Sequence, residues 1–91
     1  MKTQTKKPKI AYALGIKFKN ISLTAREGDC MYRLLNYKTI KKMSTELNLS
    51  LRTVEAYLKN VKAKLQCDSK NELLTVLSQT DFLKNYEETN K

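Results

Sequence analysis

The 91-residue chain contains no histidine and no tryptophan, and it has only two cysteines, two glycines and one proline. Without histidine, a zinc site with cysteine and histidine ligands is excluded, and two thiols alone do not complete a tetrahedral site. Two glycines do not build a glycine-rich loop around a phosphate group. Because the acidic residues are also scattered along the chain, we expect no enzyme, no cofactor and no metal site.

Long apolar runs are absent as well. No stretch approaches the roughly 18–20 apolar residues that cross a bilayer, and no signal-peptide pattern opens the chain. The sequence therefore predicts a cytoplasmic protein with no membrane partner. Cys30 and Cys67 lie within helical apolar patterns, so we expect both to be reduced, buried thiols that act as small hydrophobic side chains.

The charge of the chain is strongly positive and unevenly distributed. The net charge is +9, and residues 1–20 carry six lysines and no acidic residue. A basic balance favours a polyanionic partner. Residues 1–9 have a second interpretation, a solvated and disordered tail that only aids solubility, and the sequence leaves both open.

Apolar residues recur at spacings of three and four through most of the remaining chain, which predicts amphipathic helices. Thr24 with Glu27 and Ser69 with Glu72 form capping boxes, which mark where two of these helices begin. The expected helices span about 24–36, 39–47, 51–66 and 69–78.

A chain of this length forms at most one small domain. The pattern predicts an all-α fold, a four-helix bundle preceded by a basic, partly disordered N-terminal arm. We divide the chain into the arm and lead-in (1–20), the helical domain (21–80) and a tail (81–91) in which a short helix fits. Residues 10–14 fit either a strand-like arm or a brief helix.

The expected helix 51–66 has two faces of different character. An apolar stripe and a charged stripe run along opposite sides: Val54, Leu58, Val61 and Leu65 form the first, and Arg52, Glu55, Lys59 and Lys62 the second. A helix with an apolar back and an exposed front fits a DNA major groove, which is about 12 Å wide. The charged stripe alone also fits an ordinary solvated helix, in which Glu55 and Lys59 form a stabilising pair.

Residues 23–65 carry a pattern that is longer than any one helix. Its members, in chain order, are Leu23, Thr24, Arg26 and Glu27, then Lys41, Met43 and Ser44, then Leu47, Leu49, Ser50, Thr53 and Val54, and finally Val61, Lys64 and Leu65. In order and spacing this stretch resembles the helix-turn-helix of LuxR/FixJ/GerE-type bacterial transcriptional regulators. The resemblance implies a LuxR-type fold and a sequence-specific, nucleoid-associated regulator whose helix 51–66 enters the major groove of double-stranded DNA.

The resemblance also implies roles for single residues. The positions that contact base edges are Glu55, Ala56 and Lys59. The positions that contact phosphates are Lys41, Ser50, Arg52, Thr53, Tyr57, Lys62 and Lys64. Base contacts specify sequence, whereas phosphate contacts set the register of the protein on the duplex. For Tyr57 there is an alternative, in which the ring only packs against the domain.

In the family, the fourth helix often forms a two-fold interface between DNA-bound domains. Here the resemblance places Lys70, Asn71 and Leu74 in such a homodimer interface. The alternative is that Leu73 and Leu77 close the core of the monomer and only Leu74 points outward. RNA polymerase is a further implied partner. Family members usually carry a sensing domain in front of this module, for which residues 1–20 leave no room, so we expect a stand-alone effector or a module of a longer regulator.

Two other functions use a similar fold. A sigma-factor region-4-like module shares the L-T-x-R-E opening, but the ending from Val54 to Leu65 fits the LuxR pattern better. A protein-interaction adaptor would present an uncharged or acidic helix face, and the lysines of helix 51–66 argue against that.

The chain departs from the family pattern at Tyr37, where glycine is common after the first helix. Glycine suits a left-handed backbone there and tyrosine suits it poorly, so we expect Asn36 to adopt that conformation instead. The lysine-rich start adds one more hypothesis, a minor-groove contact by Lys6, Lys7 or Lys9.

Overall fold

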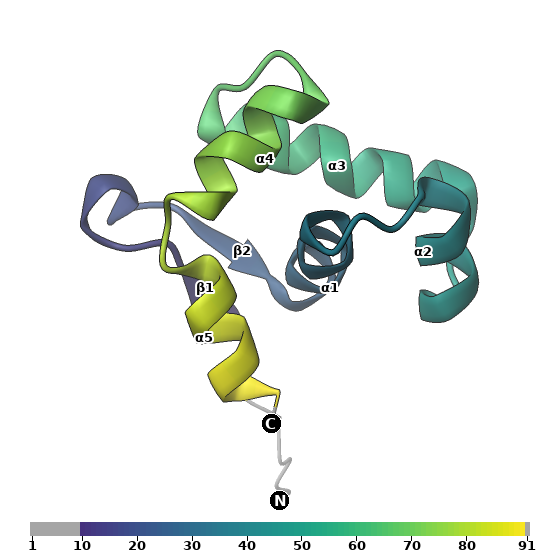
Figure 1. Cartoon of the computed structure of the whole chain (residues 1–91), viewed down its shortest axis with the longest axis horizontal. Coiled ribbons are helices and arrows are strands. Elements are labelled where there is room, and N and C mark those ends of the chain that lie inside the picture. Colours follow the sequence, from purple (N-terminus) through teal and green to yellow (C-terminus); the bar gives the residue numbers. More distant parts are fainter. Residues whose placement is uncertain (1–9, 91) are drawn as a thin grey trace, which may run out of the picture.

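The computed structural model describes residues 10–90 and contains, within that range, five α-helices, two short strands and one 3-10 turn (Figure 1). In chain order the elements are β1 (Ala11–Ala13), η1 (Ile16–Phe18), β2 (Ser22–Thr24), α1 (Ala25–Leu35), α2 (Ile40–Leu47), α3 (Leu51–Leu65), α4 (Lys70–Ser78) and α5 (Phe82–Thr89). The four predicted helices are present. The fold is mostly helical, as predicted, but the count of four helices is not confirmed: α5 lies where the sequence allowed a short helix in the tail, and β1 lies where it allowed a strand-like arm.

The sheet pairs β1 with β2 in antiparallel register, with Tyr12 opposite Leu23. Both of these side chains are buried, while their neighbours in the strands are exposed. The alternation of period two is what a strand with one face on a core requires. The strand therefore replaces the brief helix that residues 10–14 also allowed. The predicted disordered arm and its lysines Lys6, Lys7 and Lys9 lie outside the described residues.

Hydroxyl side chains cap the starts of the four predicted helices. Each accepts a hydrogen bond from the backbone N–H three residues on, as an N-cap does, and the four are Thr24, Thr39, Ser50 and Ser69. The capping box of α1 is confirmed, since Glu27 Oε1 also accepts from the Thr24 N–H at 2.9 Å. The second predicted box is only half formed. Glu72 accepts from the backbone of Asp68 instead of Ser69, at 2.8 Å.

Three non-glycine residues with positive φ end the helices: Tyr37 at 64° after α1, Asn48 at 56° after α2 and Gln66 at 57° after α3. The expectation that Asn36 takes the left-handed conformation is wrong, because Asn36 has a φ of −96°. Tyr37 takes it because the backbone closes α1 with two bonds, from Tyr37 N–H to Leu34 O and from Lys38 N–H to Arg33 O, each 3.0 Å long. This bonding pattern requires positive φ at the first residue beyond the cap.

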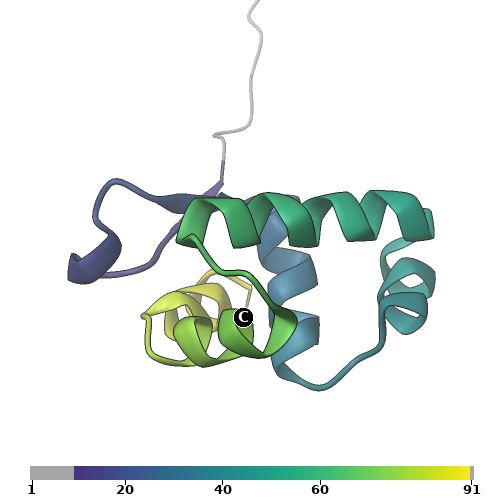
Figure 2. The same cartoon turned by 90° about the horizontal axis from the view of Figure 1, so that it is seen from above.

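The core lies between α1 and the helices around it. Figure 2 shows α3 along one edge of the molecule, with α1 beneath it and α2 at its N-terminal end. Side chains from every helix meet there, and Met31, Met43, Val61 and Leu77 are fully buried. Cys30 and Cys67 are both buried and free, as predicted. Burial raises the pKa of the Cys30 thiol to about 11, so this thiol is protonated at neutral pH.

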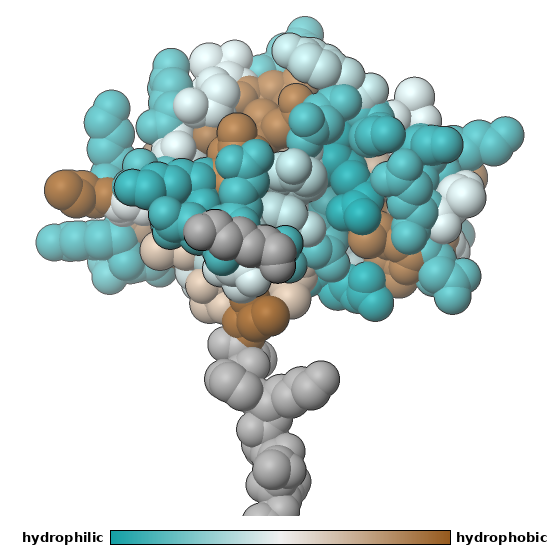
Figure 3. All heavy atoms as spheres, turned by 60° about the horizontal axis from the view of Figure 1, so that its bottom comes forward, coloured by the Kyte–Doolittle hydropathy of each residue, from teal (hydrophilic) through white to brown (hydrophobic). Residues whose placement is uncertain are grey.

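Helix α5 belongs to this core although it lies in the predicted tail. Phe82 is fully buried, and its ring meets that of Tyr12 edge-on at 5.8 Å between centroids. The Tyr12 ring fills the space where a Cβ on Gly28 would lie, at 2.4 Å, so only glycine fits at that position of α1. Core residues therefore lie outside the predicted helical domain (21–80) on both sides, at Tyr12 and at Phe82. The face drawn in Figure 3 is mostly hydrophilic, with hydrophobic side chains in small separate groups.

We expect Phe82→Ala to lower the free energy of unfolding by about 3–5 kcal/mol, because it removes a large, fully buried ring. Leu83→Ala is the matched control, since Leu83 lies on the same helix and is exposed, and we expect it to change stability by less than about 1 kcal/mol. Urea unfolding followed by circular dichroism measures both. Equal effects of the two variants would contradict the role of α5 in the core.

Candidate nucleic-acid interface

Helices α2 and α3 are joined by a tight turn that fixes their relative orientation. Asn48 ends α2 in the left-handed conformation, and the Leu49 N–H donates to Ser44 O at 2.9 Å. Ser50 then caps α3 through the Thr53 N–H at 3.0 Å. A three-residue turn between two helices that cross is the architecture of a helix-turn-helix.

The apolar stripe of α3 sets which side of this helix faces outward. All four of its members are buried: Val54, Leu58, Val61 and Leu65. Glu55, Ala56 and Lys59, the three residues predicted to read bases, are all exposed. Because residues three and four apart share a helix face, these side chains and Arg52 form one continuous outer surface, which we call the α3 outer face.

The charges of the α3 outer face take part in no ion pair within residues 10–90. Within residues 10–90, the ion pairs join Arg26 to Asp29, Arg33 and Lys38 to Glu46, and Lys64 to Glu27. None of them uses Arg52, Glu55 or Lys59, so the stabilising Glu55–Lys59 pair that the sequence allowed is not formed. These side chains are therefore available to a partner.

The predicted phosphate-binding residues surround this face with different exposures. Lys41 and Arg52 are exposed. The Ser50 and Thr53 hydroxyls bond to each other at 2.8 Å, beside the first turn of α3. The Tyr57 ring is half-buried and packs against the core. Cations and hydroxyls at both ends of the turn are suited to the two phosphate strands that border a groove.

Comparison with known protein families agrees with this geometry. The model of the luxR family of bacterial regulatory proteins matches residues 21–77. The chain belongs to this family. Its LuxR-type domain is a DNA-binding helix-turn-helix of the kind found in regulators, which are not enzymes. Searches of curated proteins and of solved structures found no match.

Lys64, one of the predicted phosphate ligands, forms bonds to other residues of the LuxR-type domain. Its Nζ donates to Glu27 Oε1 at 2.6 Å and to Ser22 O at 3.0 Å. Glu27 is 4% exposed, so its carboxylate is buried beside this one cation. A phosphate contact by Lys64 stays a prediction, and it would compete with both bonds. The pair itself joins the C-terminal end of α3 to β2 and to the start of α1.

Two exposed residues of the interface were missing from the predicted site. Asn60 lies one turn beyond Ala56 on α3, and Lys42 follows Lys41 on α2. Asparagine donates to and accepts from adenine in the major groove, which suits Asn60 to base contact. The i+4 spacing from Ala56 was the signal in the sequence that indicated this position.

The predicted dimer residues lie on α4. Lys70 and Asn71 are exposed and Leu74 is half-buried, whereas Leu73 and Leu77 are fully buried. The structure thus agrees with the alternative in which Leu73 and Leu77 close the monomer core. Leu74 and Val76, the other apolar residues of this helix, are partly buried and pack against the core.

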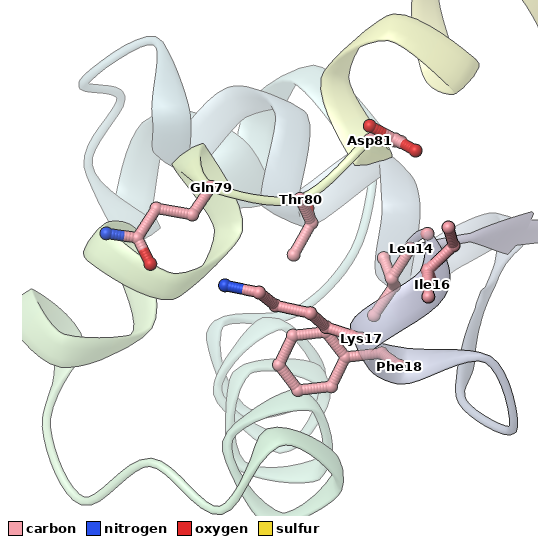
Figure 4. A pocket seen from close by; sticks show the side chains of 8 residues that line it. Leu14, Ile16, Lys17, Phe18, Gln79, Thr80 and Asp81 are labelled. Atoms are coloured by element: carbon pink, nitrogen blue, oxygen red, sulfur yellow. The ribbon is translucent and has the colours of Figure 1, made fainter.

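A hollow of about 230 Å³ lies between η1 and the α4–α5 turn. Figure 4 shows Lys17 extending along Phe18 toward Thr80, while the Asp81 carboxylate points elsewhere. The hollow thus brings together no paired acid and base. Among the residues that the structure describes, no three metal-ligating side chains cluster and no helix is long and apolar enough to cross a membrane.

We expect Lys64→Met and Glu27→Gln each to lower the free energy of unfolding by about 1–3 kcal/mol, because the first leaves the buried Glu27 carboxylate without its cation and the second removes the negative charge that binds the Lys64 ammonium. The double variant should cost less than the sum of the two, since the same interaction is lost only once. Urea unfolding of the four chains measures this coupling. Lys62→Met is the control, with an expected change within about 0.5 kcal/mol, and additive effects of Lys64 and Glu27 would contradict a direct pair.

Proposed function

We propose that this chain is a sequence-specific double-stranded DNA-binding transcriptional regulator, or the DNA-binding module of one, and that α3 reads the major groove. The observation that carries the proposal is the α3 outer face, which is exposed, carries charges that no ion pair within residues 10–90 uses, and is held at a fixed rotation by four buried residues. The match of residues 21–77 to the luxR family model supports the same function.

Each base-reading role follows from side-chain chemistry. Lys59 donates to guanine O6 or N7, Glu55 accepts from cytosine N4, and the Ala56 methyl group contacts a thymine methyl. Lys41, Arg52 and Lys62 bind phosphates on either side and hold the helix in register. In this proposal the protein is bacterial, acts in the cytoplasm at the nucleoid, and pairs as a homodimer on DNA. A contact with RNA polymerase remains a prediction.

The alternative functions are less well supported. An adaptor that had lost DNA binding has no use for Arg52, Lys59 and Lys62 around one helix, where like charges repel each other in the absence of a polyanion. A sigma-like module requires a polymerase-binding surface, and nothing in the described residues points to one.

The test begins with selection from a random double-stranded DNA pool, followed by titration of the selected duplex and a scrambled one at two salt concentrations. We expect Lys59→Ala to weaken binding to the selected duplex by about 1–3 kcal/mol and to relax preference at one base pair. Lys62→Ala should weaken both duplexes about equally and reduce the slope of log K against log salt by about one. Lys84→Ala, at an exposed position of α5, is the matched lysine control and should have little effect.

Identical behaviour of Lys59→Ala and Lys62→Ala on every duplex would contradict the division into base-reading and phosphate-binding residues. Binding without any selected sequence, lost as salt rises, would reduce the function to general attraction between a basic protein and DNA. Absence of binding at low salt would overturn the DNA-binding proposal for this chain.

A further inference from the structure

Residues 14–21 connect β1 to β2, and we call this segment the hairpin loop. All but its last residue precede the stretch 21–77 that the luxR family model matches, so the family match assigns no role to it. The loop carries two lysines, and residues 10–26 contain no acidic side chain. Lys17 and Lys19 are both exposed and take part in no ion pair within residues 10–90. The loop therefore presents positive charge outside the α3 outer face.

The hairpin loop lies at the C-terminal end of α3. Figures 1 and 2 both show it beyond that end, whereas α2 lies at the other end of α3. Near the end of α3, the Lys64 ammonium donates to Ser22 O at 3.0 Å. An open recess of about 300 Å³ lies between the two segments and is lined by Asn20, Ile21, Ser22 and Lys64. The loop and the end of α3 thus form one surface.

The backbone of the hairpin loop is held in place by hydrogen bonds and packing. The Phe18 N–H donates to Gly15 O at 3.1 Å, and the Ile21 N–H donates to Phe18 O at 3.0 Å. The Asn85 amide donates to Ala13 O at 2.9 Å, which ties the end of β1 to α5. The side chains of Phe18 and Ile21 pack against the core. A loop that is already ordered loses little conformational entropy when it binds a partner.

Polar and basic side chains connect the α3 outer face to the hairpin loop. Asn60 is exposed beside that face, and Lys64 lies one turn further along the same side of the helix. Across the recess, the Asn20 amide and the Ser22 hydroxyl belong to exposed residues and are hydrogen-bond donors. The Glu27 carboxylate is 4% exposed and is paired with Lys64. This path therefore offers donors to an anion without an exposed carboxylate among the residues named.

We propose that the hairpin loop is a second DNA-binding element, in which Lys19 and Asn20 contact backbone phosphates beside the base pairs that α3 reads. The inference rests on the proposed function, because α3 must first place its C-terminal end against the duplex. The 15 residues of α3 make a straight helix about 22 Å long, whereas the major groove is only about 12 Å wide. One end of such a helix passes over the phosphates that border the groove, and the hairpin loop lies beyond that end. Contacts of this kind add affinity and register without reading sequence.

The second lysine of the loop has a different direction. Lys17 extends along Phe18 toward Thr80 (Figure 4), in the hollow beside the α4–α5 turn. The acidic residue Asp81 also lines that hollow. Lys17 does not line the recess next to Lys64. The two lysines share residue type, loop and exposure, so Lys17 is the matched control for Lys19.

The test measures how the affinity of the full 91-residue chain for two duplexes depends on salt. One duplex is the selected sequence extended by about one helical turn on each side, and the other is trimmed to the selected base pairs. On the extended duplex, we expect Lys19→Ala to reduce the slope of log K against log salt by about 0.9 per bound copy. On the trimmed duplex it should have no effect. Lys19→Arg should restore the slope, and Lys17→Ala should leave it unchanged on both duplexes.

A second measurement locates the loop on the DNA. An iron chelate attached to Ile16→Cys, at a position that is 90% exposed, should cut the flanking base pairs of the extended duplex. The native thiols are buried and do not compete for the reagent. The same chelate on Leu83→Cys of α5 should not cut.

Equal slopes for Lys19→Ala and Lys17→Ala, or an equal effect of Lys19→Ala on both duplexes, would overturn the inference and leave the DNA-binding function intact. Cutting from neither cysteine, or from both, would overturn it as well. Unchanged slopes on DNA, together with binding to anionic phospholipid vesicles that Lys19→Ala abolishes, would assign the loop to a membrane surface instead. Failure of the proposed function appears differently, as loss of binding to both duplexes by the unaltered chain.

Discussion

The buried carboxylate of Glu27 is the interaction on which the position of α3 depends. Its Oε1 accepts from the Thr24 N–H at the start of α1 and from the Lys64 ammonium near the end of α3, and the same ammonium donates to Ser22 O in β2. The Lys64–Glu27 pair thus joins the C-terminal end of α3 to β2 and the start of α1, and its two residues are 37 positions apart in the sequence. Because Glu27 is 4% exposed, losing the Lys64 ammonium leaves a buried carboxylate without its cation. The C-terminal end of α3 is therefore held by polar contacts with fixed geometry, and its middle by apolar packing.

Apolar packing alone allows a helix to slide or rotate slightly, since hydrophobic burial has no direction. The Lys64–Glu27 pair and the Ser50 cap act at opposite ends of α3, and both are directional. Between them, Val54 and Val61 are fully buried and turn the α3 outer face toward solvent. A helix that reads base edges needs a fixed position and rotation, because bidentate hydrogen bonds to bases tolerate little displacement. The charged residues that stabilise the fold, Lys64 and Glu27, are thus different from those that the α3 outer face presents to a partner.

Much of the fold was predictable because its determinants are local. The apolar spacing of three and four residues and the hydroxyl N-caps can be recognised in a few consecutive positions of the sequence. These two signals predicted the positions of α1 to α4 well. The sheet and α5 depend on contacts between the two ends of the chain, such as the Tyr12 ring against Phe82 and the Asn90 amide on the Tyr12 hydroxyl, and no local pattern encodes such pairs. The partner of Lys64 lies 37 residues away. For the same reason, the exposed stripe of α3 was predictable, whereas the position of Lys64 and the conformation of Tyr37 were not.

The exposed carboxylate of Glu55 indicates that the α3 outer face does more than attract phosphate groups. The acidic residues Glu27, Asp29 and Glu46 pair with cations away from the α3 outer face. Glu55 differs from them, because it is an exposed carboxylate on the α3 outer face itself and has no ion pair among the described residues. A surface that needed only general affinity for a polyanion would be weakened by this charge, because a carboxylate is repelled by phosphates. An acceptor placed there does serve discrimination, since it binds cytosine N4 and is repelled by the acceptor atoms of guanine. The arrangement of charge on α3 therefore fits sequence reading better than non-specific binding.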